Sequence, residues 1–356
     1  MSRAPRPPAR PRRVTALDVA QLAGVSRSAV SRTLTEGASV SPATREKVLL
    51  AAAELGYHRN ALVRGMVRQR SGIIGVVTGR LDNPFIALGL EQLSHRLQQQ
   101  GLKTLIYSGD AESDLKVALP SMVEYRVDGC FILSNDLSPK AAALYTRLDI
   151  PLLVMFNSDM EGISDHSDEV PVGVVDVDNV EISRQVADLL VALGCRRFAY
   201  VAGLPNAATS RERQRGFAEG LAAQGRALAA VETGHFSYEG GRDAARALLA
   251  LDGRPDALYC GNDLMAMAAM DVARSEFGLE VPRDLAIVGF DDIQVAGYPA
   301  YDLTTVRQPV ARIVETGVEM MLAFIEDPAV GLREVRLPSE LIHRRSTMTT
   351  RSGASP

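Results

Sequence analysis

Short β-rich apolar runs that alternate with helical stretches constrain this chain most, and they fill it from residue 72 onward. The runs form two sets: IIGVVT (73–78), KTLIYS (103–108), GCFILS (129–134) and PLLVMF (151–156), then RFAYVA (197–202), ALAAVET (227–233), ALYCG (257–261) and LAIVGF (285–290). Helices are expected between them at 84–99, 113–126 and 138–148, and at 179–193, 210–224, 238–251 and 263–276. This alternation predicts two similar α/β lobes with parallel sheets. Ligands of such sheets bind beyond the carboxyl ends of the strands, so we expect a binding cleft between the lobes.

The charge of the chain is divided unevenly. Residues 1–71 carry thirteen Lys/Arg against four Asp/Glu, whereas the rest carries twenty-six against thirty-nine, for a net charge of −4. This asymmetry indicates a basic module for a polyanion joined to an acidic body. Five of the cations lie in residues 1–13. A disordered basic tail on a plain enzyme is therefore the alternative, and residues 14–71 must decide between the two.

Residues 14–57 are predicted to form three short helices. Thr15 can cap the helix ALDVAQLA, with Asp18 forming an imperfect capping box. Ser26 can cap a second helix, RSAVSRTL, after Gly24 ends the first. The pair Ser41-Pro42 opens a third, ATREKVLLAAAELGY, because proline favours the first position of a helix.

The first two helices are joined by only about three residues, which forces a tight crossing. Ala20, Gly24 and Val30 have the spacing that a helix-turn-helix needs. Val30 and Leu34 share one face of the second helix. The opposite face carries donors that suit guanine edges and phosphates, from Arg27, Ser28, Ser31 and Arg32. A plain three-helix cluster with a solvated polar face is the alternative.

These segments resemble the DNA-binding head of the lactose-repressor/purine-repressor family, through VTALDVAQLAGVSRSAVSRTL, VSPATREKVLLAAAELGY and the NALVRGM that begins at Asn60. The resemblance implies that the second helix enters the major groove, where Arg27 and Ser28 read bases. It implies that Arg32 contacts a base or a nearby phosphate. Contacts to the DNA backbone, which set register, are implied for Thr15, Ser26, Ser31 and Asn60.

Residues 58–71 correspond to a linker that, in the family, folds into a hinge helix on DNA. The family's leucine that wedges the central base step is replaced by Met66, which can still wedge. Arg59 stands where the family usually has proline, and Gly65 lies inside the short helix, at a cost of about 1 kcal/mol against alanine. We therefore expect a flexible basic linker in the free protein, with phosphate contacts from Arg64, Arg68 and Arg70.

The resemblance continues through the body, in DNPF (82–85), VDG (127–129), RERQRGF (211–217), PDALYCGNDLMAM (255–267), VPRDLAIVGFDDI (281–293) and LTTVRQPV (303–310). It implies a periplasmic-binding-protein-like body of residues 72–346, in which the chain crosses three times between the lobes. We expect the crossings near residues 172, 305 and 328. The first lobe would then hold 72–171 and 306–328, and the second 172–305 and 329–346. Residues 1–13 and 347–356 are expected to be disordered tails.

The candidate effector residues share a position just after a strand, and they are Asn83, Phe85, Phe156, Arg213, Phe236, Asn262 and Asp291. Aromatic rings can stack on a sugar, while Arg, Asn and Asp bind hydroxyls. Each residue also has a structural alternative, in the core or at a helix cap. Many sugar-binding members carry aspartate where this chain has Phe156. That loss favours a sugar acid or phosphosugar with Arg213 as counter-charge, whereas Asp291 argues against a highly charged ligand.

Several classes of protein are not supported by the sequence. Three scattered cysteines without a Cys-x-x-Cys pair indicate a reducing compartment. No run of about 18 apolar residues and no apolar stretch after the basic N-terminus is present, so we expect no membrane span, no secretory signal and a cytoplasmic, nucleoid-associated protein. The five histidines lack metal spacing, and there is no Gly-x-Ser-x-Gly, P-loop or Gly-x-Gly-x-x-Gly motif. We expect no cofactor, no metal and no catalysis.

The sequence thus predicts an all-α helix-turn-helix head on an α/β body of two parallel-sheet lobes. The expected function is an effector-responsive transcriptional repressor of carbohydrate or sugar-acid catabolic genes. It would bind a near-palindromic operator as a homodimer, and no heptad repeat after residue 346 predicts a larger coil. The alternatives are a purine-type co-repressor-dependent regulator, a solute-binding protein, and an α/β enzyme with a DNA-binding appendage.

Overall fold

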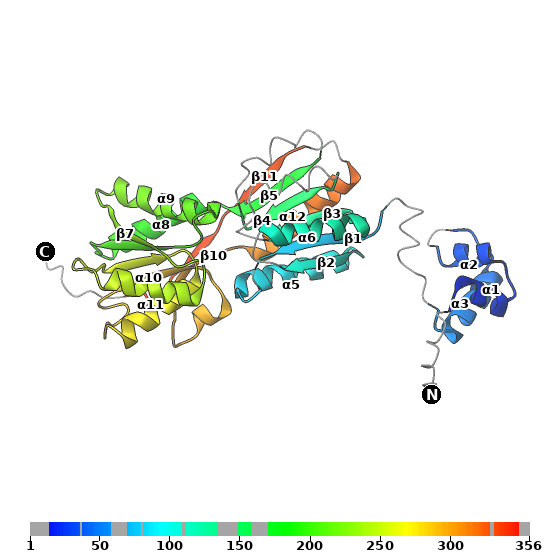
Figure 1. The fold of residues 1–356 in the computed structure, drawn as a ribbon, viewed down its shortest axis with the longest axis horizontal. Coiled ribbons are helices and arrows are strands. Elements are labelled where there is room, and N and C mark those ends of the chain that lie inside the picture. The colour runs from blue at the N-terminus through cyan, green and yellow to red at the C-terminus, as the bar shows by residue number, and fades with distance from the viewer. Residues whose placement is uncertain are drawn as a thin grey trace, which may run out of the picture. The chain divides into compact units, whose positions relative to one another are not determined.

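The computed structural model describes residues 14–35, 38–57, 70–79, 81–108, 112–133, 149–157, 170–327 and 331–348 (Figure 1). The chain divides into two units, Met1–Ser71 and Gly72–Pro356. We call the first the head and the second the body. Within the described ranges, no helix is both long enough and apolar enough to cross a membrane.

The head contains the three predicted helices, α1 (Ala16–Ala23), α2 (Arg27–Thr33) and α3 (Pro42–Glu54). The hydroxyls of Thr15, Ser26 and Ser41 accept backbone N–H groups in the first turns, so all three predicted caps are confirmed. The capping box is complete, because the Asp18 carboxylate also accepts the Thr15 N–H at 2.7 Å. Gly24 has a φ of 64° and turns the chain between α1 and α2. The three helices share a small core of Val19, Ala20, Val30, Val48, Ala51 and Ala52.

The first sheet of the body is wholly parallel and has the strand order β11-β5-β4-β3-β1-β2. Its strands are β1 (Ile73–Thr78), β2 (Lys103–Ser108), β3 (Gly129–Leu133), β4 (Leu152–Met155), β5 (Val172–Val177) and β11 (Arg333–Leu337). Alternate residues of the strands enter two apolar clusters on opposite faces. One face packs against α5 (Pro84–Gln99) and α12 (Val310–Glu326), and the other packs against α6 (Glu112–Glu124).

The second sheet has the strand order β12-β10-β9-β8-β6-β7, with only β12 antiparallel. Its strands are β6 (Phe198–Ala202), β7 (Leu228–Thr233), β8 (Ala257–Cys260), β9 (Ala286–Asp291), β10 (Thr304–Arg307) and β12 (Glu340–Ile342). Two helix pairs flank it on opposite sides (Figure 1): α8 (Asn179–Ala192) with α9 (Ala208–Ala223), and α10 (Tyr238–Leu249) with α11 (Asp263–Ser275). A short 3-10 helix, η2 (Gln294–Gly297), follows β9. The predicted class, a helix-turn-helix head on a two-lobed α/β body, is confirmed.

The chain passes between the two sheets after β5, after β10 and between β11 and β12 (Figure 1). The expected lobe boundaries were wrong for two strands, because they assigned β5 and β11 to the second lobe, and the boundary expected at 305 divided β10, which lies wholly in the second sheet. β5 pairs in parallel with β4, with Leu152 opposite Val172, and β11 adds to the free edge of β5. An apolar run shows that a strand is buried, but it does not show which sheet the strand joins.

Some other expectations changed or were not tested. The predicted helix 138–148 lies outside the described residues, and the strands β5 and β10 to β12 and the helix α12 were not among the predicted elements. The tail was expected to begin at residue 347. Thr347 is instead buried, and its hydroxyl lies 2.7 Å from that of Thr304. The C-terminal segment is therefore anchored to the second sheet as far as Thr347.

Candidate functional sites

The second helix of the head presents a polar surface. Arg27, Ser28, Ser31 and Arg32 are all exposed, while Val30 and Thr33 on the other face are buried. The exposed face therefore has the residues that the sequence predicted for contact with bases and with the DNA backbone. Which of them reads a base remains a prediction.

Two candidate hydroxyls of the head have local roles already. The Thr15 hydroxyl donates to the Asp18 carboxylate at 2.7 Å, and the Ser26 hydroxyl accepts the Ala29 N–H at 3.2 Å. These bonds place both side chains at helix N-termini, where backbone N–H groups favour anions such as phosphate. A contact of either residue, or of the helix end that it caps, with a DNA phosphate remains a prediction. Asn60 and Met66 lie outside the described residues, so their roles remain predictions.

In the first lobe, the aromatic candidates pack against each other. Phe85 and Phe156 are 4% and 3% exposed, and their rings meet edge to face with centroids 4.9 Å apart. Phe156 follows β4 with a φ of 61°, in the left-handed region that a bulky side chain seldom adopts. Asn83 is half-buried and caps α5 by accepting the Phe85 N–H at 3.0 Å. The structure thus groups these three residues at the carboxyl end of the first sheet.

In the second lobe, Arg213 has a fixed position. It is 4% exposed, its Nε donates to the Asn179 Oδ1 at 2.9 Å, and its Nη1 donates to the Gly261 carbonyl at 2.6 Å. The guanidinium carbon lies 3.5 Å from the ring centroid of Phe290, a cation–π contact. A buried guanidinium with part of its donor set already used can present only a few N–H groups in a fixed direction.

Asp291 follows Phe290 as the last residue of β9, and it is also buried. Its Oδ1 accepts the Gln308 Nε2–H at 2.8 Å. Burial raises the pKa of Asp291 to about 7, and the nearby Arg213 guanidinium lowers it in part. The structure therefore brings together Arg213 and Asp291, as the sequence predicted.

The remaining two candidates are linked to each other. Asn262 caps α11 by accepting the Met265 N–H at 3.0 Å, and its Nδ2 donates to the Phe236 carbonyl at 3.1 Å. The ring of Phe236 lies over Gly203, where any Cβ would clash with it. Asn262 thus fixes the loop that carries Phe236, and a direct contact of either residue with an effector remains a prediction.

Three buried polar residues complete this group, and the sequence reasoning missed them. Asp176 lies in β5, Asn179 opens α8 and Gln308 follows β10. The Asn179 Nδ2 donates to the Asp176 Oδ2 at 3.0 Å, and burial raises the pKa of Asp176 to about 7. The available signal was a carboxylate inside the otherwise apolar run VGVVDV.

Two oxygens of this group are buried acceptors that receive no hydrogen bond from the part of the chain that the structure describes: the Asp176 Oδ1 and the Gln308 Oε1. Burying an acceptor without a donor is costly. We call the group of Asp176, Asn179, Arg213, Asp291 and Gln308 the interlobe polar cluster. Its two unpaired acceptors suit a bound molecule that donates hydrogen bonds.

Comparison with known proteins gives the family. Residues 15–60 match bacterial regulatory proteins of the lacI family, and residues 187–347 match a periplasmic binding protein-like domain. The HTH-type transcriptional repressor PurR of Aliivibrio salmonicida (strain LFI1238) is 30% identical over 337 residues, 93% of this chain and 98% of that repressor. The chain belongs to the lacI family of bacterial regulatory proteins. The resemblance found in the sequence is confirmed, and a lacI-family chain is a DNA-binding transcriptional regulator and not an enzyme.

Solved structures of lacI-family regulators agree. A lac repressor dimer bound to operator and the anti-inducer ONPF is 28% identical and matches with a TM-score of 0.84, over 95% of this chain and all of that one. A complex of the regulator CelR with cellobiose is 30% identical and matches with a TM-score of 0.71, over 94% of this chain and all of that one. The full-length match shows that head and body together form one lac-repressor-like chain.

Proposed function

We propose that this lacI-family chain is an effector-controlled repressor that binds a near-palindromic operator as a homodimer. The observation that carries the proposal is the exposed polar face of α2, with Arg27, Ser28, Ser31 and Arg32 opposite a buried Val30. One small head buries too little surface for tight specific binding, so two heads on a symmetric dimer would read two half-sites. The lac repressor, a structural relative, is a dimer on its operator. Such a regulator works where the DNA is, in the cytoplasm at the nucleoid.

We infer that the effector is an uncharged, hydroxyl-rich molecule of the sugar class. The unpaired Asp176 Oδ1 and Gln308 Oε1 can accept hydrogen bonds from hydroxyls. A carboxylate or phosphate on the ligand offers only acceptors, and it adds negative charge where Asp176 and Asp291 already share Arg213. The interlobe polar cluster therefore favours a neutral sugar over the sugar acid or phosphosugar that the sequence suggested. The relative CelR was crystallised with cellobiose.

A purine-type co-repressor is the second candidate, because PurR proteins are among the similar relatives. Purine N–H groups can also donate to the two unpaired oxygens. The solute-binding and enzyme alternatives lose support, since the head and the body together match lacI-family regulators along almost the whole chain.

The two sites would be coupled through the linker 58–71, which leads directly into β1 of the first lobe. Effector binding that changes the lobe arrangement would change the spacing of two linkers in the dimer, and with it the entry of Met66 into the minor groove. Such coupling must be reciprocal, so operator DNA changes effector affinity by the same factor.

The first experiment selects an operator from a randomised duplex library with the full chain, then screens the chain by thermal shift. The probes are cellobiose, ribose, gluconate, glucose 6-phosphate and hypoxanthine. A ligand at 100 times its Kd stabilises the native state by about 2.7 kcal/mol.

We expect the library to yield a preferred duplex. We also expect a neutral sugar to raise the melting temperature of the chain and to change the affinity of the chain for that duplex. A hit with only gluconate or glucose 6-phosphate contradicts the neutral effector, and a hypoxanthine hit favours the purine class. Arg213→Met should abolish the thermal shift, whereas Arg215→Met, an exposed arginine on the same helix, should keep it. A library that yields no preferred duplex would overturn the regulator proposal.

A further inference from the structure

Asp291 and the residue after it have an unfavourable backbone conformation. Their φ angles are 114° and 53°, so two successive residues with side chains lie at positive φ. Such a conformation persists only where surrounding contacts hold it. The contacts that hold it therefore also determine where the Asp291 carboxyl points.

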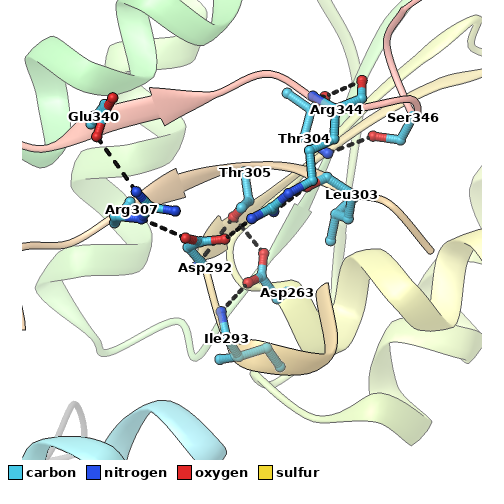
Figure 2. Close-up of polar contacts among 10 residues, drawn as sticks. All are labelled: Asp263, Asp292, Ile293, Leu303, Thr304, Thr305, Arg307, Glu340, Arg344 and Ser346. Carbon is cyan, nitrogen blue, oxygen red and sulfur yellow. Dashed lines mark hydrogen bonds and ion pairs between the residues drawn. The ribbon is translucent and has the colours of Figure 1, made fainter. Parts of the chain in front are cut away.

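The side chain of Asp292 is held by two arginines (Figure 2). Its Oδ1 accepts from the Arg344 Nη2 at 2.6 Å, and its Oδ2 accepts from the Arg307 Nε at 2.6 Å. The Asp292 side chain is only 8% exposed, and that of Arg344 is 18% exposed, so solvent screens this ion pair weakly. Arg307 is half-exposed and also lies 3.8 Å from the Glu340 carboxylate.

The backbone of the same segment is held from the other side. The Ile293 N–H donates to the Asp263 Oδ2 at 2.8 Å, and the Asp292 N–H donates to the Thr305 hydroxyl at 3.4 Å. That hydroxyl in turn donates to the Asp263 Oδ1 (Figure 2). Asp263 is fully buried, so its carboxyl oxygens are acceptors in a fixed position.

Arg344 comes from a segment far away in sequence. It follows β12, and its backbone N–H donates to the Thr304 hydroxyl at 2.8 Å while its Nη1 donates to the Leu303 carbonyl at 2.8 Å. The next anchor is Ser346, whose hydroxyl accepts the Thr304 N–H at 2.8 Å. The C-terminal segment therefore places the Arg344 guanidinium against Asp292 from a fixed backbone (Figure 2).

We propose that Arg344 and Arg307 are positioning residues, which clamp Asp292 and so hold Asp291 toward Gln308 and Arg213 in the effector site. The proposal rests on the effector role of Asp291 proposed above. Arg344 acts through Asp292, the neighbour of Asp291, and within the described ranges the Asp292 side chain bonds to the two arginines and not to the interlobe polar cluster. The clamp makes effector affinity depend on the segment that follows β12.

The test compares Arg344→Met with Arg345→Met in the full-length chain. Arg345 is the matched control: it is the next residue, it is 63% exposed and it pairs with Asp302, at 3.9 Å, and not with Asp292. The first measurement needs no ligand. Aspartate labelled with 13C at the carboxyl is titrated by NMR, and the Asp291 signal is assigned by its absence from Asp291→Asn.

We expect Arg344→Met to release Asp291 into solvent, so that its pKa falls from about 7 toward the ordinary value of a carboxyl. Arg345→Met should leave that titration unchanged. Cellobiose, used as the probe, should bind Arg344→Met at least tenfold more weakly, while both variants keep the affinity of the ligand-free wild type for the selected duplex. An unchanged Asp291 titration in Arg344→Met, or an equal change in Arg345→Met, overturns the proposal.

Two further variants separate positioning from a loss of folding. Arg344→Lys keeps the charge but cannot reach both Asp292 and the Leu303 carbonyl, so it should show an intermediate change. Glycine adopts a φ of +53° freely, so Asp292→Gly removes the need for a clamp at this position. Arg344→Met should therefore change the Asp291 titration less in the Asp292→Gly background than in the wild-type background. If the wild type does not bind cellobiose, that result contradicts only the choice of cellobiose as effector. The Asp291 titration still tests the positioning role of Arg344 and Arg307.

Discussion

The protonation of Asp291 makes the stability of the body depend on pH. Burial raises its pKa from an ordinary 3.8 to about 7, so the folded chain holds this proton over a pH range in which the unfolded chain has lost it. The stabilisation from this group is complete below pH 4 and is lost as the pH rises through 7. Replacing Asp291 with asparagine, which stays neutral, should remove this loss.

The expected size follows from linkage. Each unit of pKa difference is worth about 1.4 kcal/mol, so the full shift corresponds to about 4 kcal/mol. Between pH 5 and pH 8 the wild type should lose about 3 kcal/mol through this group. The difference in unfolding free energy between Asp291→Asn and wild type should grow by that amount, whatever the constant cost of the amide. Asp176 titrates in both proteins. In Asp291→Asn it no longer shares the Arg213 guanidinium with a second carboxylate, so Arg213 lowers its pKa more. The unfolding free energy of the variant therefore depends even less on pH.

Urea unfolding followed by far-UV circular dichroism at pH 5, 6, 7 and 8 measures this difference, since the chain has no tryptophan. The control is Asp243→Asn, which removes a carboxylate that is 78% exposed and pairs with Arg246 at 2.9 Å. Its difference from wild type should vary little with pH. If the Asp291→Asn difference changes by less than about 1 kcal/mol over the same range, Asp291 ionises normally in the folded chain and its burial does not raise its pKa.

Three further predictions concern DNA binding. Arg27→Ala should cost about 1–3 kcal/mol on the selected duplex and relax the preference at one base position; equal losses on all sequences in a competition assay would remove its base-reading role. Deleting residues 1–13 should reduce the slope of log affinity against log salt and leave the selected sequence unchanged, whereas a new preferred sequence would mean that the segment reads a groove. Met66→Gly should weaken specific binding more than non-specific binding in a gel-shift titration, and equal losses would refute the wedge.

The head could be predicted almost residue by residue, because its determinants are local. Thr15, Ser26 and Ser41 cap the helices within three residues of their own positions, and Gly24 supplies the positive φ of the turn. Lobe membership is not local in this sense. β5 belongs to the first sheet because it pairs in parallel with β4, and no pattern within VGVVDV predicts that pairing.

The interlobe polar cluster was predicted only in part for the same reason. Arg213 and Asp291 could be placed because Arg213 lies on the helix after β6 and Asp291 ends β9, and the carboxyl ends of parallel strands meet. Asp176 and Gln308 enter the cluster from β5 and from the residue after β10, so they depended on the lobe assignment that the sequence did not resolve. The left-handed backbone at Asp291 has no sequence signal, since aspartate there is not a glycine.

The interlobe polar cluster is built on the residues that carry the chain between the lobes. Asp176 precedes the first crossing and Gln308 precedes the second, and the Asn179 amide joins β5 to α8 across the first. An ion pair at 3.5 Å between Arg336 of β11 and Glu212 of α9 links the same two lobes. A ligand whose hydroxyls donate hydrogen bonds to Asp176 and Gln308 would therefore bind at the segments that connect the two lobes. Only the difference in its affinity for two lobe arrangements could then shift the chain between them, and under the proposed coupling the first lobe would pass that shift to the DNA linker through β1.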